Sequence, residues 1–432
     1  MKEKKIILSE DSKNNKLLNN RWMRAAVPAL LIHCSIGTVY CWSTFKEAIA
    51  NQIGMSTFSV GWAFSFAIFF LGMSAAFAGR MVEKDIKKSS LISCLFFTAG
   101  MIGTGFFIDN TTGVTALIGI YICYGFIMGI GLGVGYITPV KTLMLWFKDK
   151  KGLATGISIM GFGLAKAIAT PIMEIIQRNF GVASMFYILG AVYFVMMITG
   201  HLLIRKPAGW VEAHDEKSRF RKRYMFKDRT FTGIWLMFFI NIHCGLMLIS
   251  YEKQLLSLVF AASASLAVIV STVPSVTAAM NALGRIGFST LSDQMSDRNT
   301  IYKVIFVKSL IVSCMSFVVF IISGNSYSGI AGVCVILLLV VVNAGYGGGF
   351  STLPALLSSR YGMKNVSEIH GLALSAWAIA GLTGNNTTEM ILEISGGSYT
   401  YIFAVAALLY IIAFVVSSKM IASKGMNIEI QE

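Results

Sequence analysis

Long apolar stretches alternate with short polar segments along the whole chain. A helix of about 20 apolar residues crosses the roughly 30 Å hydrocarbon core of a bilayer. Stretches of that length centre on residues 25–45, 57–79, 89–108, 114–145, 153–176, 183–204, 231–251, 265–291, 302–323, 329–352, 369–388 and 400–418. This pattern predicts an all-α, polytopic membrane protein with twelve transmembrane helices.

The longest polar segment divides the apolar stretches six and six. We therefore expect an N-terminal six-helix half over residues 1–204, a cytoplasmic linker over 205–230 and a C-terminal six-helix half over 231–432.

Three landmarks recur in the same order in the two halves. They are the tripeptide IHC at 32–34 and 242–244, a charged decapeptide at 79–88 and 289–298, and a proline in spans four and ten, Pro139 and Pro354. The first two pairs are offset by 210 residues and the prolines by 215. Internal repeats of this kind are typical of transporters, which predicts two pseudo-symmetric halves.

The composition and the charge distribution agree with this picture. Hydrophobic residues make up 55% of the chain and charged residues only 13%. The net charge of +15 does not indicate a nucleic-acid partner, because the charges gather on one side of the predicted membrane. With both termini on one side, that side holds 29 of the 36 Lys and Arg, and the other holds only Lys46, Arg178 and Lys253. This positive-inside bias predicts that both termini are cytoplasmic.

Two other features limit the chemistry that we expect. The seven cysteines lie singly in apolar stretches and form no C-x-x-C pair, so we expect no disulfide, metal or cofactor. Residues 1–20 are polar and basic without an apolar core, so we expect no cleaved signal peptide.

The two decapeptides, GRMVEKDIKK and STLSDQMSDR, each place an acid beside basic residues in a short cytoplasmic turn. The first contains Glu83 and Lys84, and the second contains Asp293 and Arg298. Such a cluster can bridge helix ends in one conformation and break in another, which predicts a two-state gate. Both decapeptides resemble degenerate copies of the major facilitator signature G-x-x-x-D-R-x-G-R-R.

Four segments carry a more specific resemblance: GTVYCWSTF (37–45), GIGLGVGYITPVKTLMLWFKDKKGLATG (129–156), NALGRIGFSTLSD (281–293) and GGGFSTLPALLSSRYGMKNVSEIHG (347–371). The glycines of the second segment favour close helix packing, since no strand precedes them as in a nucleotide-binding loop. Together the segments resemble the oxalate/formate antiporter family of the major facilitators. The resemblance implies a carrier of small carboxylates in a plasma membrane. We expect a monomer in the bacterial cytoplasmic membrane, with the lipid bilayer and its substrate as partners.

Arg285 is the leading candidate for binding an anion. Thr277, Asn281, Arg285 and Ser289 fall four residues apart and form one polar stripe on an otherwise apolar span. Such a stripe faces a cavity or a partner rather than lipid. The alternative is snorkelling, because Arg285 precedes Asp293 by only eight residues, about 12 Å. The resemblance implies that Arg285 binds a substrate carboxylate through two parallel hydrogen bonds.

Lys166 lies in the apolar run GFGLAKAIATPI, a little beyond the middle of the membrane. A cation at this depth costs about 2.5–3.5 kcal/mol on insertion scales. We expect no acidic residue deep enough to neutralise it, so an anionic substrate is the leading partner. A deprotonated lysine and a contact with helix-end carbonyls are the alternatives.

Trp377 marks a departure from the resembled family. Its position matches a lysine in the eleventh helix that is associated with oxalate exchange, so that second cation is missing here. Lys166 is a candidate replacement, although we place it about 10 Å farther out than Arg285. One cation suits a monocarboxylate and two suit a dicarboxylate, and the sequence leaves both open.

Several aromatic residues match positions that line the central cavity in the resembled family. They are Tyr40, Trp42, Tyr136, Phe350 and Trp377. A small-ligand site needs apolar walls with few polar groups, although such residues also serve packing or the interfacial belt.

His33 and His243 occupy equivalent places in spans one and seven. Each is a candidate proton site, and the alternative is a hydrogen-bonded core residue.

We therefore predict a secondary transporter of small organic anions that works by alternating-access exchange. Mono- or dicarboxylates such as formate, oxalate, lactate or pyruvate are the expected substrates. The alternative is a proton-coupled monocarboxylate symporter. A membrane enzyme or sensor is disfavoured, because the sequence has no H-E-x-x-H motif and no paired carboxylates within the spans.

Overall fold

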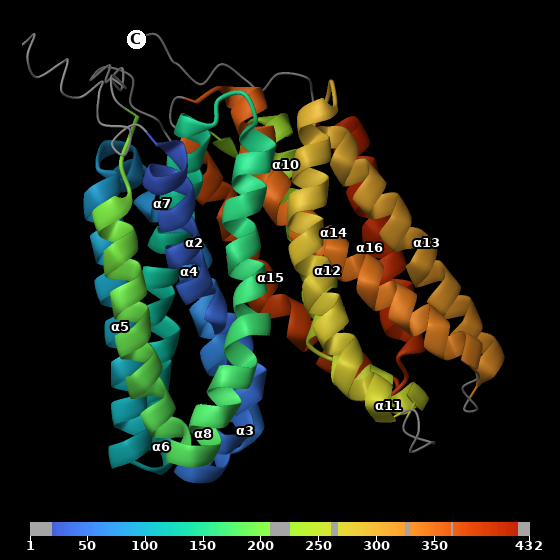
Figure 1. The fold of residues 1–432 in the computed structure, drawn as a ribbon. Coiled ribbons are helices and arrows are strands. Elements are labelled where there is room, and N and C mark those ends of the chain that lie inside the picture. The colour runs from blue at the N-terminus through green and yellow to red at the C-terminus, as the bar shows by residue number, and fades with distance from the viewer. Residues whose placement is uncertain (1–19, 208–224, 261–266, 325–328, 364–365, 422–432) are drawn as a thin grey trace, which may run out of the picture.

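The computed structural model describes residues 20–207, 225–260, 267–324, 329–363 and 366–421, and helices make up most of these ranges (Figure 1). The helices of the N-terminal half are η1 (Trp22–Ala26), α2 (Val27–Ile36), η2 (Gly37–Cys41), α3 (Trp42–Ile53), α4 (Thr57–Lys84), α5 (Ile86–Asn110), α6 (Gly113–Ile120), η3 (Tyr121–Met128), α7 (Gly129–Trp146) and α8 (Lys151–Leu203). Those of the C-terminal half are α10 (Arg229–Ile249), α11 (Glu252–Phe260), α12 (Ala267–Gln294), α13 (Asn299–Ser323), α14 (Gly329–Tyr361), α15 (Val366–Ile394) and α16 (Thr400–Lys419).

Nine helical stretches within the described ranges are long and apolar enough to cross a membrane. The longest, α8, contains two spans, because Gly181 interrupts it with a φ of 83° that glycine adopts without strain. Helices α12 and α15 are 28 and 29 residues long and carry more polar residues than the other spans. Together these give the twelve transmembrane helices that the sequence predicted.

The two halves lie side by side, and most of the predicted linker, residues 208–224, falls outside the described residues. The first helix, the end of α8, the start of α10 and the end of α16 lie at one end of the bundle, at the top of Figure 1. We call this end the linker end and the opposite end the far end. Arg229 joins two of these segments by donating a hydrogen bond of 3.2 Å to the carbonyl oxygen of Lys419.

The halves approach each other most closely at the linker end. The most extensive contacts between the halves are those of α4 with α15 and of α8 with α12. Gly152 shows how close the second pair lies, since an added Cβ would be 2.2 Å from the carbonyl oxygen of Ser289. Toward the far end the ribbons of the two halves spread apart (Figure 1).

The first and seventh spans are broken at related positions. In the first span the 3₁₀ segment η2 separates α2 from α3, which begins at Trp42. In the seventh, residues 250–251 separate α10 from α11, which begins at Glu252. Trp42 and Glu252 are 210 residues apart, the same offset as the repeated IHC tripeptides. The internal repeat therefore extends to the helix breaks and makes α11 the counterpart of α3.

Candidate substrate site and gates

Arg285 lies between the two halves, where α12 faces α8. Its side chain is 1% exposed. Its Nε donates to Oδ1 of Asn281, one turn earlier, and its Nη1 donates across the halves to the carbonyl oxygen of Ile159, both at 2.9 Å. Gly163 makes room for the guanidinium, since a Cβ there would lie 2.8 Å from Nε. The stripe that includes Arg285 thus faces the other half, and this position excludes snorkelling to the membrane surface.

The guanidinium group lacks a carboxylate partner. Among the residues that the structure describes, no acidic side chain lies within ion-pair distance of Arg285. Both of its hydrogen-bond acceptors, the amide of Asn281 and the carbonyl of Ile159, are neutral. The positive charge of Arg285 is therefore held between the halves, and only neutral hydrogen-bond acceptors and aromatic rings stabilise it.

Aromatic rings from both halves surround Arg285. Its Cζ lies 5.8 Å from the ring centroid of Phe162 and 5.5 Å from that of Phe350, at cation–π range. Tyr136 and Trp377 extend this wall, with centroid distances of 5.5 Å to each other and 4.5 Å between Trp377 and Phe350. Three of the predicted aromatic site residues, Tyr136, Phe350 and Trp377, thus form one cluster.

Tyr40, a further predicted residue, connects the halves beside this cluster. Its hydroxyl group lies 3.0 Å from the hydroxyl of Tyr346, and its ring packs edge-on against Phe162 with centroids 5.4 Å apart. Trp42, by contrast, packs inside the N-terminal half against Tyr124, with ring centroids 4.3 Å apart. It lies away from the cluster.

Several polar atoms in the aromatic wall lack a partner. The Tyr136 hydroxyl, the Trp377 Nε1 and the His370 Nε2 are buried and form no hydrogen bond within the described chain. The rings of Tyr136 and His370 lie 6.0 Å apart, so these atoms belong to one region. A buried polar atom without a partner costs about 1–3 kcal/mol, and a bound polar ligand removes that cost. Trp377 fills the place of the missing second cation with an indole that can donate a hydrogen bond.

Lys166 lies one helical turn beyond Gly163 on the same face of α8. Its side chain is only partly buried. Gly163 lies beside the Arg285 guanidinium, and Lys166 follows it by three residues. Lys166 is therefore about 4.5 Å beyond the level of Arg285 along α8, whereas the sequence placed it about 10 Å beyond.

Lys166 forms no ion pair among the residues that the structure describes. The nearby α12 contacts an acid of its own half, because Glu252, which is 6% exposed, accepts a 2.5 Å hydrogen bond from Thr277. Counting residues placed Glu252 after the seventh span, whereas the helix break carries it inward against α12.

The two predicted proton sites are both hydrogen-bonded. His33 is fully buried, with Nδ1 2.7 Å from the carbonyl oxygen of Ser158 and Nε2 3.1 Å from that of Tyr136. His243 lies in the C-terminal half, where Nδ1 is 2.9 Å from the hydroxyl of Thr383. His33 thus contacts the backbone of the aromatic wall, whereas His243 does not contact it.

At the linker end, Glu83 joins three helices. One carboxylate oxygen forms a 2.5 Å ion pair with Lys141 of α7, and the other accepts 2.7 Å from the backbone N–H of Ser367 at the start of α15. The second contact crosses between the halves. Lys84, which the sequence placed in this cluster, is exposed, and the cation that pairs with Glu83 is Lys141.

Asp293 occupies the equivalent position in the other half, 210 residues later. Its two oxygens accept 2.9 Å hydrogen bonds from the backbone N–H groups of Gly152 and Leu153 at the start of α8. Arg298 donates to the same carboxylate at 2.6 Å. Each half therefore contributes one acid to the first turn of a helix in the other half.

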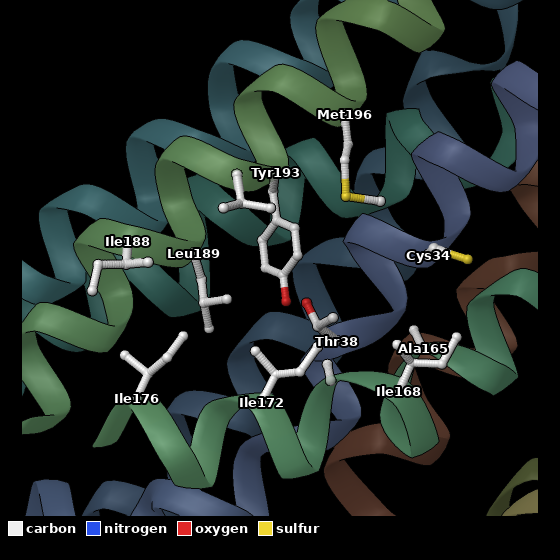
Figure 2. A pocket seen from close by; sticks show the side chains of 12 residues that line it. Cys34, Thr38, Ala165, Ile168, Ile172, Ile176, Ile188, Leu189, Tyr193 and Met196 are labelled. Atoms are coloured by element: carbon white, nitrogen blue, oxygen red, sulfur yellow. The ribbon is translucent and has the colours of Figure 1, made fainter. Parts of the chain in front are cut away.

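A separate cavity of about 190 Å³ lies within the N-terminal half, between α2, η2 and the two legs of α8 (Figure 2). Isoleucine, leucine and alanine side chains line most of it. Its two hydroxyl groups, on Thr38 and Tyr193, point toward each other (Figure 2). The cavity has no charged lining residue, so it does not suit a carboxylate.

The Major Facilitator Superfamily model matches residues 29–385 of this chain. The chain belongs to the Major Facilitator Superfamily. Its sequence is 24% identical to the oxalate:formate antiporter of Oxalobacter formigenes over 419 residues, which cover 96% of this chain and 94% of that protein. The predicted resemblance to the oxalate/formate antiporters is thus confirmed, and the protein is a membrane transporter rather than an enzyme.

Two further comparisons agree with that membership. Monocarboxylate transporter 4 of Gallus gallus is 24% identical over 40% of this chain and 37% of its own length. The crystal structure of a bacterial homologue of the iron transporter ferroportin matches with a TM-score of 0.71 at 12% identity, over 92% of this chain and 99% of that chain. The structural match shows the fold.

Several residues of the candidate site went unrecognised in the sequence. Phe162, Tyr346 and His370 lie in apolar spans without a distinguishing pattern. Glu252 had a usable signal, because applying the 210-residue offset to the first span places it at the start of a helix leg. That inference needs the break in the first span, which the sequence does not show.

Proposed function

We propose that this protein exchanges small organic anions, mono- or dicarboxylates such as formate, oxalate, lactate or pyruvate, across the membrane by alternating access. The observation that carries the proposal is the buried Arg285 between the halves, without an acidic partner among the described residues. A carboxylate ligand would supply the missing negative charge and accept two parallel hydrogen bonds from the guanidinium.

The surroundings of Arg285 support a small anion. The guanidinium group already bonds to Ile159 of the other half, so a substrate that competes for this donor would alter a contact between the halves. The free polar atoms of Tyr136, His370 and Trp377 would complete the binding of a carboxylate or hydroxyl group. Aromatic walls with few polar groups suit such a ligand.

The contacts at the linker end support alternating access. Glu83 and Asp293 each cap a helix of the opposite half, so the halves are held together at that end. In the predicted orientation the linker end is cytoplasmic, and this conformation would open toward the outside. Breaking both caps would allow the halves to rock the other way.

The charge of the site favours exchange over symport. An empty site keeps the buried charge of Arg285, and closing around an uncompensated charge is costly. An anion is therefore needed for the return step as well. In proton-coupled symport, a protonated group would neutralise the site instead, and an inward proton gradient would drive uptake.

The decisive experiment is counterflow of labelled oxalate and lactate in proteoliposomes. Arg285→Gln should lower the rate about ten- to a hundredfold, since it removes a charged hydrogen bond worth about 1.5–3 kcal/mol. Lys308→Gln is the matched control, because Lys308 is another intramembrane cation, but it is exposed on α13. Unchanged counterflow in a folded Arg285→Gln variant would refute the proposal. Uptake that follows a pH gradient without internal substrate would favour symport.

A further inference from the structure

The apolar cavity in the N-terminal half lies in a wedge between two parts of one helix. Gly181 divides α8 into a first leg, residues 151–180, and a second leg, residues 182–203. The cavity of about 190 Å³ is enclosed by these two legs together with α2 and η2 (Figure 2). Each leg is one membrane span, so the cavity lies between neighbouring spans.

The first leg of α8 separates this cavity from the candidate substrate site. Gly163 lies beside the Arg285 guanidinium, where an added Cβ would be 2.8 Å from Nε. Ala165 and Ala169 of the same leg line the cavity instead. The two spaces therefore lie against different faces of one helix, and a ligand in the cavity would not contact Arg285.

The mouth of the cavity faces lipid. Ile168, Ile172 and Val192 line it and are 51%, 46% and 45% exposed. Exposed apolar side chains within a membrane span contact acyl chains, because the bilayer core holds no water. Leu189 and Tyr193 line the same cavity but are only 4% and 5% exposed. A chain that enters from the bilayer would therefore reach side chains that lipid at the surface does not contact.

The cavity runs along the helices. Its lining residues recur every few positions, from Ala165 to Ile176 on the first leg and from Ile188 to Met196 on the second. The first series covers about 16 Å of helix, close to half of the roughly 30 Å hydrocarbon core. Gly181, which separates the legs, follows Ile176 by five residues, so the cavity begins near the far end. Its length and direction match one acyl chain of the leaflet at that end.

The lining suits hydrocarbon better than a polar ligand. Among the described residues no charged side chain contributes to it. The Thr38 hydroxyl donates a 2.6 Å hydrogen bond to the carbonyl oxygen of Ser35, so it requires no outside partner. An apolar cavity of about 150 Å³ in another protein stays free of water and takes up small apolar molecules. Left empty, a space of this size deprives its lining of dispersion contacts, which a hydrocarbon chain would restore.

We propose that the cavity between the legs of α8 binds one acyl chain of a membrane lipid from the leaflet at the far end. The chain enters between Ile172 and Val192 and packs against Leu189 and Tyr193. The lipid headgroup stays outside the cavity, at the membrane surface.

Photolabelling locates the chain. The purified protein is reconstituted with phosphatidylcholine that carries a diazirine midway along one acyl chain, irradiated and analysed by peptide mass spectrometry. Adducts should form on Leu189 and Tyr193 as well as on exposed positions such as Ile311 of α13, which is 52% exposed. Phosphatidylcholine with the diazirine on its headgroup should give no adduct on Leu189 or Tyr193.

A variant that fills the cavity tests whether the chain enters it. Ala169 lines the cavity and is 7% exposed, so the phenyl group of Ala169→Phe takes up the space. Adducts on Leu189 and Tyr193 should be lost, whereas adducts on Ile311 should remain. Ala191→Phe is the matched control, because Ala191 is exposed on the second leg and does not line the cavity. It should leave every adduct in place, and thermal unfolding checks that both variants are folded.

Three outcomes would overturn the proposal. Adducts confined to exposed residues in the wild type would do so without any variant. Adducts on Leu189 and Tyr193 that persist in folded Ala169→Phe would show that the lipid reaches them by another route. Adducts on these residues from the headgroup probe would show that a polar group occupies the cavity. Arg285 takes no part in these measurements, so the proposed function is unaffected by each of them.

Discussion

The two acidic clusters at the linker end perform the same structural task with different partners. Glu83 and Asp293 are related by the internal repeat, and each accepts hydrogen bonds from the first turn of a helix in the opposite half. Glu83 accepts a hydrogen bond from one backbone amide and pairs with the buried Lys141. Asp293 accepts hydrogen bonds from two backbone amides and pairs with the more exposed Arg298. The N-terminal cluster therefore depends on its ion pair, and the C-terminal cluster depends on its helix cap.

The two copies of the internal repeat therefore share the position of the acid against a helix of the opposite half, but the acid takes its cation from a different place in each copy. In the N-terminal copy the cation comes from α7, 58 residues away, and its side chain is 2% exposed. In the C-terminal copy it comes from the same loop, five residues away, and is 19% exposed. Removing a partner should therefore have unequal consequences in the two copies.

The largest effect is expected for Lys141→Met. This change leaves Glu83 buried without its cation, and breaking a buried pair costs about 3–5 kcal/mol. We expect a loss of that size in the free energy of unfolding, measured by denaturation in detergent. The double variant Lys141→Met/Glu83→Gln should recover much of the loss. A loss below about 1 kcal/mol would show that the pair is solvated and the two clusters are alike.

A smaller effect, confined to one cluster, is expected for Asp293→Asn. The amide keeps one acceptor but loses the charge at the N-terminus of α8, at a cost of about 1–2 kcal/mol. Hydrogen–deuterium exchange at Gly152 and Leu153 should accelerate about five- to thirtyfold, whereas exchange at Ser367 should change little. Glu83→Gln should reverse this selectivity. Equal acceleration at both helix starts would mean that the clusters open as one unit.

The smallest effect is expected for Arg298→Ala. Asp293 keeps both backbone hydrogen bonds, and a partly exposed ion pair contributes about 0–1 kcal/mol. Stability and exchange at Gly152 should therefore remain close to wild type. The exposed Lys84→Ala is the matched control and should have no measurable effect. A loss comparable to that of Lys141→Met would contradict the proposed asymmetry.

The sequence predicted the spans well because each one is a local property. A run of about 20 apolar residues must form a helix in a bilayer, since every backbone polar group has to be satisfied within the segment. All twelve predicted stretches fall within helices of the structure except for a few residues at their ends and those outside the described ranges. The polar stripe containing Arg285 was visible for the same reason, because spacing by four residues is a local signal.

The candidate site was only partly visible. Arg285, Tyr136, Phe350 and Trp377 were singled out and lie together, whereas Phe162 and Tyr346 looked like ordinary apolar positions. The partner of Glu83 was assigned to its chain neighbour Lys84, yet it is Lys141. Chain neighbours are poor guides here because consecutive residues at a helix end point in different directions.

The sequence by itself determined that this chain crosses a membrane twelve times, repeats one half and carries cations where lipid does not tolerate them. The tertiary structure alone decided which of those cations are compensated. Arg285 keeps its charge without an acid among the described residues, whereas Lys141, another cation within a span, forms an ion pair with Glu83. The physical reason is that Coulomb energy depends on distance in space and on exclusion of water. Neither is encoded by separation along the chain.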